Sequence, residues 1–308
     1  MTGRREVWLA LGAVGLVLLV AFLAPWLRFV LTLALAKGIA ALGVMLLLRA
    51  GLVSFGHALY LAFAAYVVAF LAPHVSEAML LIPLAAVAAA LLGLVIGLFV
   101  VRYREIFFGM LNLALSMVFY SLLEKSYAIT HGSDGMRVAA TTWLGQSLAR
   151  ENAEWAGLSA ALLLALGFAF LARRYLASPL GEALQAIKTR EARLEFMGLQ
   201  PRRVLLVAYV LSAAMAGTAG ALIALSTRHV TPLLGYWTAS GELVFIVILG
   251  GAGGVLGPFL GALAYELVRV YAAATVADAW QLILGAVLLA VILFARGGLL
   301  SLLRGRRA

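Results

Sequence analysis

The sequence contains no cysteine and very little charge. Only 12% of its 308 residues are charged, whereas 65% are hydrophobic, and the mean hydropathy is +1.08. Soluble domains carry about 25% charged residues, so this composition excludes a soluble enzyme, a disordered chain and a fibrous repeat. The absence of cysteine excludes disulfides, thiolate metal sites and a cysteine nucleophile.

The sequence also lacks the motifs of a catalytic chain. It has no Gly-x-x-x-x-Gly-Lys-Ser/Thr phosphate loop, the motif that holds ATP in many ATPases. Its glycine-rich run Gly251–Gly257 has the wrong spacing for a dinucleotide turn. The four histidines form no metal-ligand motif such as His-Glu-x-x-His. We therefore expect no enzyme activity, no metal and no cofactor.

Long hydrophobic runs are abundant instead. A helix crosses the roughly 30 Å hydrocarbon core of a bilayer with about 20 apolar residues. Nine stretches approach that length: Val7–Leu27, Phe29–Leu48, Leu52–Ala72, Met79–Val101, Ile106–Leu123, Trp155–Leu171, Val204–Leu225, Leu243–Leu267 and Val276–Ala295. They predict one all-α domain over residues 1–308, a polytopic transmembrane helix bundle with about 8–10 membrane segments.

The basic residues assign the two sides of the membrane. Sixteen of the 23 lysines and arginines fall in one set of ends and loops, and six fall in the other. Because cytoplasmic loops are enriched in Lys and Arg, this distribution places both termini and residues 172–203 in the cytoplasm, and residues 124–154 outside. The net charge of +10 is then explained by membrane topology, and no nucleic acid is expected as a partner.

Two cytoplasmic termini require an even number of crossings, so one of the nine stretches does not simply cross. The main suspect is Leu243–Leu267, which Gly250–Gly254 and Pro258 interrupt, because glycine and proline break helices. The start of Leu52–Ala72 is a second suspect. We expect eight full spans and one broken or re-entrant element, with ten crossings as the alternative.

The long inside loop predicts two short amphipathic helices. Ser178 and Pro179 suit a helix start, and Thr189 suits the N-cap of a second helix. Gly198 suits a left-handed helix end. On the residues alone, this pair of helices either rests on the bilayer surface or docks a cytoplasmic protein through Leu194 and its neighbours.

This loop, Ser178–Ala192 followed by Gly198, resembles the coupling loop of branched-chain amino acid ABC importer permeases. Other motifs resemble the same family in the same order, over about residues 35–265: Ala41–Gly43 with Gly51–Ala58, Ile129–Met136, Ser212–Leu222 and Leu249–Pro258. The length and the single coupling loop fit the LivM-type subunit better than the shorter LivH-type subunit. The resemblance implies an inner-membrane permease with a second homologous permease, two cytoplasmic ATP-binding subunits and an external substrate-binding protein as partners, within the lipid bilayer.

Three groups of residues are candidates for function. Polar residues inside spans usually face protein or water, and half-helix N-termini favour anions. The candidate substrate pathway contains Ser54, Gly56, His57, Asn112, Glu242, Gly250 and Gly251. The resemblance implies ATPase coupling through Gly181, Ala186, Glu191, Leu194, Phe196, Met197 and Gly198. It implies contact with the binding protein through Thr130, Gly132, Asp134 and Gly135.

Simpler roles remain open for several of these residues. His57 can close a broken helix start through a local hydrogen bond, and Glu242 can be an interfacial carboxylate near Arg228 or Arg269. Lys37 is expected to pair inside the protein or to reach an interface. The turn Thr130–Met136 can simply reverse the chain.

The sequence thus favours the permease subunit of an ATP-driven importer for branched-chain or related hydrophobic amino acids. Urea, short amides and aromatic acids are alternative cargo within the same family. An ion-driven transporter or channel is the alternative from another class, with Lys37 as its intramembrane charge. A membrane-embedded enzyme would need a clustered polar site, and the sequence shows none.

Overall fold

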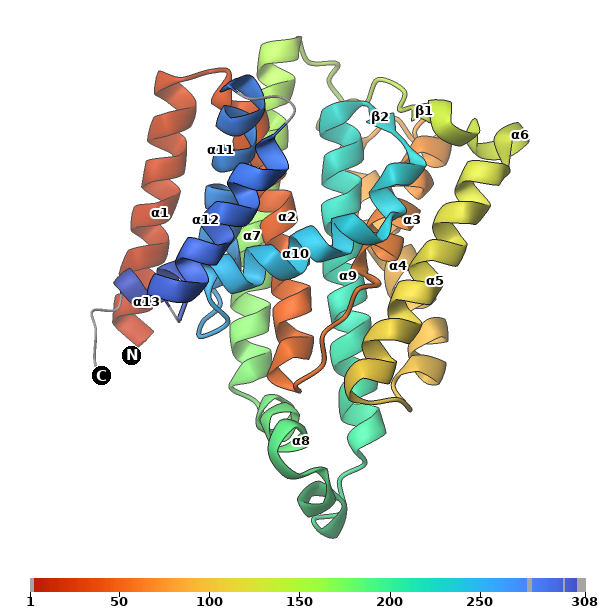
Figure 1. Cartoon of the computed structure of the whole chain (residues 1–308). Coiled ribbons are helices and arrows are strands. Elements are labelled where there is room, and N and C mark those ends of the chain that lie inside the picture. The colour runs from red at the N-terminus through yellow and green to blue at the C-terminus, as the bar shows by residue number, and fades with distance from the viewer. Residues whose placement is uncertain (1–2, 276–278, 296, 304–308) are drawn as a thin grey trace.

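The structure is a computed structural model that describes residues 3–275, 279–295 and 297–303, and it is almost entirely helical (Figure 1). The long helices are α1 (Gly3–Leu23), α2 (Leu27–Arg49), α3 (His57–Leu71), α4 (Ala78–Val100), α5 (Glu105–Lys125), α7 (Arg150–Leu176), α8 (Pro179–Phe196), α9 (Pro201–Thr227), α10 (Trp237–Gly250), α11 (Gly257–Thr275) and α12 (Trp280–Phe294). The short elements are α6 (Tyr127–Thr130), η1 (Gly132–Asp134), β1 (Met136–Arg137), β2 (His229–Val230), η2 (Pro232–Gly235) and α13 (Leu299–Leu303).

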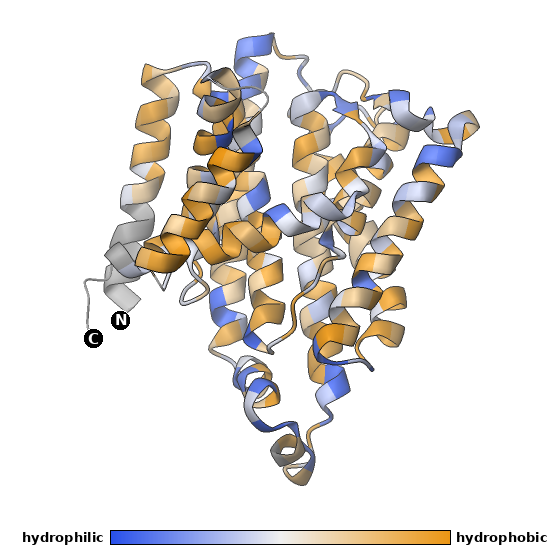
Figure 2. Cartoon of the chain, viewed as in Figure 1, coloured by the Kyte–Doolittle hydropathy of each residue, from blue (hydrophilic) through white to orange (hydrophobic). Residues whose placement is uncertain are grey.

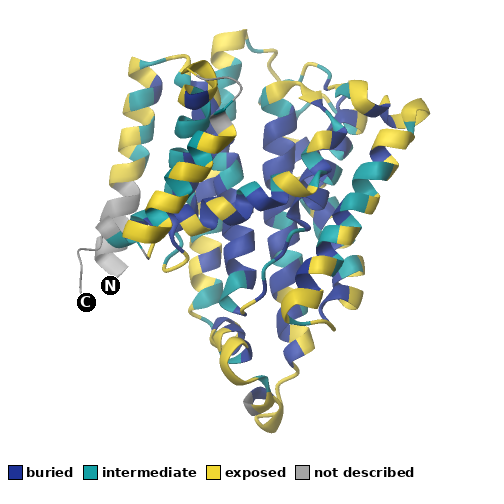
Figure 3. Cartoon of the chain, viewed as in Figure 1, coloured by how far each residue is buried: buried dark blue, intermediate teal, exposed yellow. Residues whose placement is uncertain are grey.

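Five of the described helices are long and apolar enough to cross a membrane by themselves: α2, α4, α5, α7 and α9. The apolar part of α2 is 89% buried and that of α9 is 72% buried, whereas α4, α5 and α7 are each 28% buried. Helices α2 and α9 therefore form the centre of the bundle, and α4, α5 and α7 present apolar faces outward (Figure 3). An apolar surface of this extent is suited to lipid rather than water.

Small residues bring the central helices together. A Cβ atom at Gly217 of α9 would collide with the Cβ of Ala89 in α4, and one at Gly93 would collide with that of Ala213. Ala89 and Gly93 of α4, and Ala213 and Gly217 of α9, are each four residues apart, so one stripe of small residues on each helix faces the other. Close helix contact of this kind is a main source of packing energy inside a membrane.

Two of the segments that pass through the bundle are interrupted, and both were suspected from the sequence. Residues 52–56 are not helical, so α3 begins only at His57. Helix α10 has 14 residues and ends at Gly250, and a turn of residues 251–256 precedes α11. In Figure 1, α10 runs obliquely across the middle of the bundle.

Besides α8, ten described helices have at least 14 residues, which is the upper end of the expected range of membrane segments. The stretch Leu243–Leu267, expected to be one broken element beside eight full spans, contains parts of two helices. The predicted stretch Val276–Ala295 is represented by α12, although residues 276–278 lie outside the described part of the chain. The start of α1 and the whole of α13 lie toward the end of the bundle from which α8 projects (Figure 1). We call this the α8 end.

Hydrophilic residues gather at the two ends of the bundle (Figure 2). At the end opposite α8, strands β1 and β2 form a small antiparallel sheet in which Met136 pairs with Val230 and Arg137 pairs with His229. Arg28 at the same end forms an ion pair with Glu151, at 3.1 Å, and lies over the ring of Trp155.

Candidate functional site

The two interrupted segments meet inside the bundle. The hydroxyl of Ser240 in α10 accepts a hydrogen bond of 2.8 Å from the backbone amide of Ala58, in the first turn of α3. Ser54 Oγ accepts a bond from the amide of Gly56 and lies 3.0 Å from His57 Nδ1. A helix start has free amide groups, and here serine side chains satisfy two amides at the start of α3. The local role considered for His57 is therefore present in the structure.

The second ring nitrogen of His57, Nε2, is unpaired among the described residues. Its side chain is fully buried, and no described group forms a hydrogen bond with Nε2. The ring of Tyr60, one turn further along α3, lies edge-on to the imidazole at 6.3 Å between centroids.

A chain of polar side chains continues from Tyr60 through two other helices. The two tyrosine hydroxyls of Tyr60 and Tyr209 lie 2.8 Å apart, and Tyr209 donates to Asn112 Oδ1 at 2.6 Å. Asn112 Nδ2 in turn donates to the carbonyl of Phe108. All of these side chains are buried, so Asn112, a predicted pathway residue, lies in a hydrogen-bonded core beside the start of α3. Sequence reasoning missed both tyrosines, although a tyrosine within an apolar span usually has a buried polar partner.

Helix α10 also contributes Glu242 to a group of four charged residues, Lys37, Glu242, Glu266 and Arg269. Lys37 Nζ in α2 lies 3.0 Å from Glu242 Oε2 and 2.7 Å from Glu266 Oε1 of α11. Arg269 Nε lies 3.1 Å from the other oxygen of Glu266. The expectation that Lys37 pairs inside the protein is confirmed. Glu242 was expected near Arg228 or Arg269; its carboxylate contacts Lys37, and Arg269 belongs to the same group through Glu266.

The predicted pathway glycines Gly250 and Gly251 serve backbone packing. A Cβ at Gly250 would collide with the carbonyl of Gly257, and Gly251 has φ +93°, which favours glycine. The amide of Gly251 donates to the carbonyl of Val247. The amides of Gly251 and Gly56 both have intramolecular partners, so neither is free to bind a substrate carboxylate in this conformation.

The prediction of two short helices in this loop is confirmed: residues 179–189 and 191–196 are helical, and Arg190 between them is not (φ −155°, ψ 94°). The two halves together carry the label α8, with a kink at Arg190. The predicted cap, Thr189, does not cap the second half; its hydroxyl bonds back to the carbonyl of Ala186 at 3.1 Å. Gly198 has φ +77°, as expected for a left-handed helix end. The first half packs tightly, since a Cβ at Gly181 would collide with the carbonyl of Tyr175.

The three apolar residues considered for docking are placed differently. Leu194 is buried within the chain, whereas Phe196 is 92% exposed and Met197 is 75% exposed. Leu194 therefore holds α8 against its own protein and is not available to a partner. Phe196 and Met197 project from the tip of the loop.

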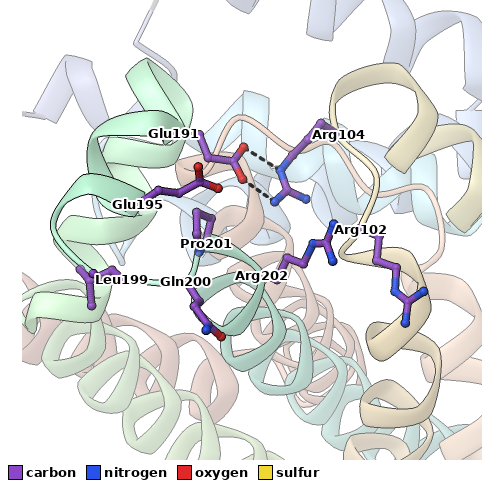
Figure 4. Close-up of a pocket in the computed structure, with 9 residues that line it drawn as sticks. Arg102, Arg104, Glu191, Glu195, Leu199, Gln200, Pro201 and Arg202 are labelled. Carbon is purple, nitrogen blue, oxygen red and sulfur yellow. Dashed lines mark hydrogen bonds and ion pairs between the residues drawn. The ribbon is translucent and has the colours of Figure 1, made fainter.

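A cleft of about 720 Å³ lies beside this tip (Figure 4). Arg104, from the turn between α4 and α5, spans it with two bonds to Glu191, of 2.9 Å and 2.6 Å. The cleft is lined by Arg102, Arg104, Glu191, Glu195, Gly198, Leu199, Gln200, Pro201 and Arg202.

At the opposite end, the turn Thr130–Met136 is held by its own contacts. Thr130 is buried and its hydroxyl donates to the carbonyl of Ser126, and Gly132 and Gly135 have positive φ angles of +52° and +71°. Asp134 is exposed and accepts a hydrogen bond from the Tyr127 hydroxyl at 3.1 Å, which raises the pKa of Tyr127. Of the four predicted contacts, Asp134 is the one whose side chain is free to meet a partner.

The adjoining loop is anchored by Glu77, which sequence reasoning missed. Its carboxylate accepts hydrogen bonds from the amides of Gly145 and Leu144, at 2.9 and 2.8 Å, and from the Thr142 hydroxyl. The amide of Gly145 contributes most to holding the pKa of Glu77 below its usual range.

Within the described residues there is no cluster of side chains that could hold a metal ion. The long apolar helices, the two interrupted segments that meet at a buried polar core, and the projecting kinked helix together define an integral membrane protein of the transporter class. The family model described as the branched-chain amino acid transport system permease component matches residues 26–292, and the chain belongs to this family.

Two curated relatives are similar to the chain. The high-affinity branched-chain amino acid transport system permease protein LivM of Escherichia coli (strain K12) is 29% identical over 248 residues, which cover 72% of this chain and 57% of the relative. The protein of the same name from Salmonella typhimurium (strain LT2) gives the same identity and the same coverage. The match thus spans little more than half the length of these relatives. No solved structure matches the chain.

Proposed function

We propose that the chain is a permease subunit of an ATP-driven importer for branched-chain or related hydrophobic amino acids, located in the inner membrane. The family membership and the names of the two relatives support this function. The chain has no phosphate loop of its own, so ATP hydrolysis takes place on two separate cytoplasmic subunits. A second homologous permease completes the pathway, and an external binding protein delivers the substrate.

The observation that carries the ATPase contact is the exposed apolar tip of α8. Phe196 and Met197 are 92% and 75% exposed at the end of this loop, and large exposed apolar groups of this kind favour a protein partner. The α8 end is accordingly the cytoplasmic end, with both termini on that side. Coupling depends on this tip, on Gly198 for the left-handed turn behind it, and on Leu194 for its attachment to the bundle.

The interrupted segments form the best candidate for the moving part of the pathway. His57 lies at the start of α3, Asn112 of α5 packs beside it, and Ser240 joins α3 to α10. Broken helices at membrane depth are tolerated where protein or water surrounds them, and they occur at transporter substrate sites. Substrate passes along this junction when the two permeases change their relative arrangement. At the outer face, Asp134 contacts the binding protein.

The pairing of the charged residues around Lys37 argues against the alternative of an ion-driven transporter. Its two cations and two carboxylates pair with one another, so it carries no net charge and joins α2, α10 and α11 as a structural contact.

The test is to purify the tagged chain from its native membranes in mild detergent and to identify the proteins that accompany it. We expect two ATPases and a second permease, followed by ATP-dependent uptake of leucine by the reconstituted complex. Recovery of the chain alone, with the same result after crosslinking, would overturn the proposal. Uptake of urea, amides or aromatic acids in place of leucine would keep the importer and change its cargo.

A matched pair of variants tests the docking tip. Phe196→Ser removes an exposed apolar side chain at the α8 tip, and Leu144→Ser removes one, 82% exposed, at the opposite end. We expect Phe196→Ser to release the ATPases and Leu144→Ser to retain them. Equal retention by both variants would contradict docking at the tip.

A further inference from the structure

One face of α5 contacts the coupling helix α8 at one end and both interrupted segments further along. Arg104, Phe108, Asn112 and Ser116 follow one another at intervals of four residues. Residues four apart in a helix lie on the same side, so these side chains form a single row, which we call the α5 row. Arg104 is the N-cap residue of the helix, and the other three lie within it.

The first member of the row, Arg104, holds the second half of α8. Its guanidinium makes two bonds to the Glu191 carboxylate, of 2.9 and 2.6 Å (Figure 4). It also donates to the carbonyl oxygens of Val101 and Tyr103, in the turn that follows α4. A guanidinium that binds a carboxylate with two parallel bonds fixes orientation as well as distance. Glu191 directly follows the kink at Arg190, so the pair grips the part of α8 that carries the exposed tip.

The next members of the row touch the buried polar core. The rings of Phe108 and Tyr209 meet edge-on with their centroids 6.0 Å apart. Asn112 accepts the hydrogen bond from Tyr209, and a Cβ at Gly56 would lie 2.9 Å from three of its atoms. Asn112 therefore packs directly against the backbone that precedes α3.

The last member reaches the other interrupted segment. Ser116 Oγ donates to the carbonyl of Gly235 at 2.9 Å, and Gly235 lies two residues before α10. Ser116 is fully buried, so its bond is shielded from water. The α5 row thus joins α8 to the segments that lead into both α3 and α10.

We propose that Arg104 is a positioning residue that transmits displacement of the α8 tip into α5, and through the α5 row to the two interrupted segments. The inference rests on the proposed function, because the displacement is supplied by the ATPases that dock on Phe196 and Met197. The kink at Arg190 separates the tip from the tightly packed first half of α8, so the tip needs its own attachment to the bundle. Glu191 and Arg104 supply that attachment on the α5 side.

A double-mutant cycle measures the coupling between Arg104 and Glu191. The complete complex is reconstituted with Arg104→Gln, with Glu191→Gln, and with both substitutions. The quantity measured is the number of substrate molecules taken up per ATP hydrolysed. We expect each single variant to lower this ratio about fivefold or more, and the double variant to lower it no further, because the two side chains act as one contact.

Two further variants separate transmission from simple stabilisation. Arg102 lines the same cleft, and its side chain forms no ion pair among the described residues. Arg102→Gln should therefore leave the ratio unchanged. Ser116→Ala breaks the far end of the row and should lower the ratio without releasing the ATPases. A loss of complex assembly or thermal stability alone would not change the ratio in the assembled fraction.

The outcomes distinguish this inference from the proposed function. If the wild-type complex shows no ATP-dependent uptake, the proposed function fails and the inference fails with it. If the wild-type complex transports and Arg104→Gln keeps the wild-type ratio, the inference alone is overturned. Strictly additive effects of Arg104→Gln and Glu191→Gln would also overturn it, since they would show that the ion pair is not the element that transmits the displacement.

Discussion

Replacing Lys37 by methionine should destabilise the whole bundle. Lys37 lies halfway along α2 and contacts the carboxylates of Glu242 and Glu266, while Arg269 contacts Glu266. The four residues together are neutral. Methionine fills a similar volume but leaves two carboxylates with one cation, so the site gains an uncompensated negative charge in a low-dielectric environment.

The structure sets the size of this effect. Removing one partner of a buried ion pair costs about 3–5 kcal/mol. The lower end of that range applies here, because the Glu242 side chain is 28% exposed and Arg269 still compensates Glu266. A loss of about 3 kcal/mol corresponds to a fall of about 5 °C in the melting temperature for a chain of this length.

The assay is thermal unfolding of the detergent-purified protein, followed by tryptophan fluorescence. Lys125→Met is the matched control, because Lys125 is an exposed cation at the end of α5, and its melting temperature should be unchanged. The double variant Lys37→Met with Glu242→Gln removes one charge of each sign and should regain most of the loss. An unchanged melting temperature for Lys37→Met, or a double variant less stable than the single one, would refute the electrostatic reasoning.

Three further predictions follow from the fold. Gly250→Ala should abolish a monodisperse size-exclusion peak, because its Cβ collides with a carbonyl of α11, whereas Gly285→Ala, with nothing within 4 Å, should gain about 0.5–1 kcal/mol of helix stability. Tyr209→Phe should cost about 1–3 kcal/mol in thermal unfolding, since it leaves two buried polar partners without their hydroxyl. Because the folded-state pKa of Glu77 is lowered, its carboxylate stabilises the loop around residues 142–145 above its unfolded pKa of about 4.3. This stabilisation is lost as the pH falls through the lower folded value. The variant Ser147→Cys has a single thiol, and a spin label attached to it should become mobile in that acidic range. When Glu77→Gln is added, the label should be mobile at every pH. An unchanged spectrum in either case would contradict the role of Glu77.

Local sequence signals predicted the long helices well. Hydrophobic length alone located α2, α4, α5, α7 and α9, because membrane crossing imposes a minimum apolar run. Glycine at residues 250–254 located the break after α10, and Gly198 located the end of α8. These features depend on the conformational preferences of a few consecutive residues, which a sequence displays directly.

Contacts between distant segments were not predictable in the same way. Ser240 satisfies an amide 182 residues earlier, and nothing around a serine in an apolar run indicates that partner. Glu266 was not singled out, although a carboxylate inside an apolar helix needs a cation and Lys37 was expected to pair inside the protein or to reach an interface. Considering the intramembrane charges together would have predicted the Lys37–Glu266 pair. No feature of the sequence predicted that the kink in α8 falls at Arg190, because the neighbouring Thr189 is chemically the better helix cap.

Helix α10 connects these long-range contacts. With 14 residues it is too short to cross the membrane alone, and its carbonyl and amide ends must be satisfied inside the protein. Its three attachments differ in kind: a hydroxyl to the start of α3, a carboxylate to Lys37, and glycine packing onto α11. The hydroxyl and carboxylate contacts each depend on a single bond that a small rotation of α10 would break, whereas the glycine contact keeps the backbones of α10 and α11 together through such a rotation. Because Lys37 and Glu266 also hold α11 to α2, a rotation of α10 away from α3, with α10 still packed on α11, is the least costly rearrangement around this junction. Cross-linking α10 to α11 should preserve transport, and cross-linking α10 to α3 should abolish it.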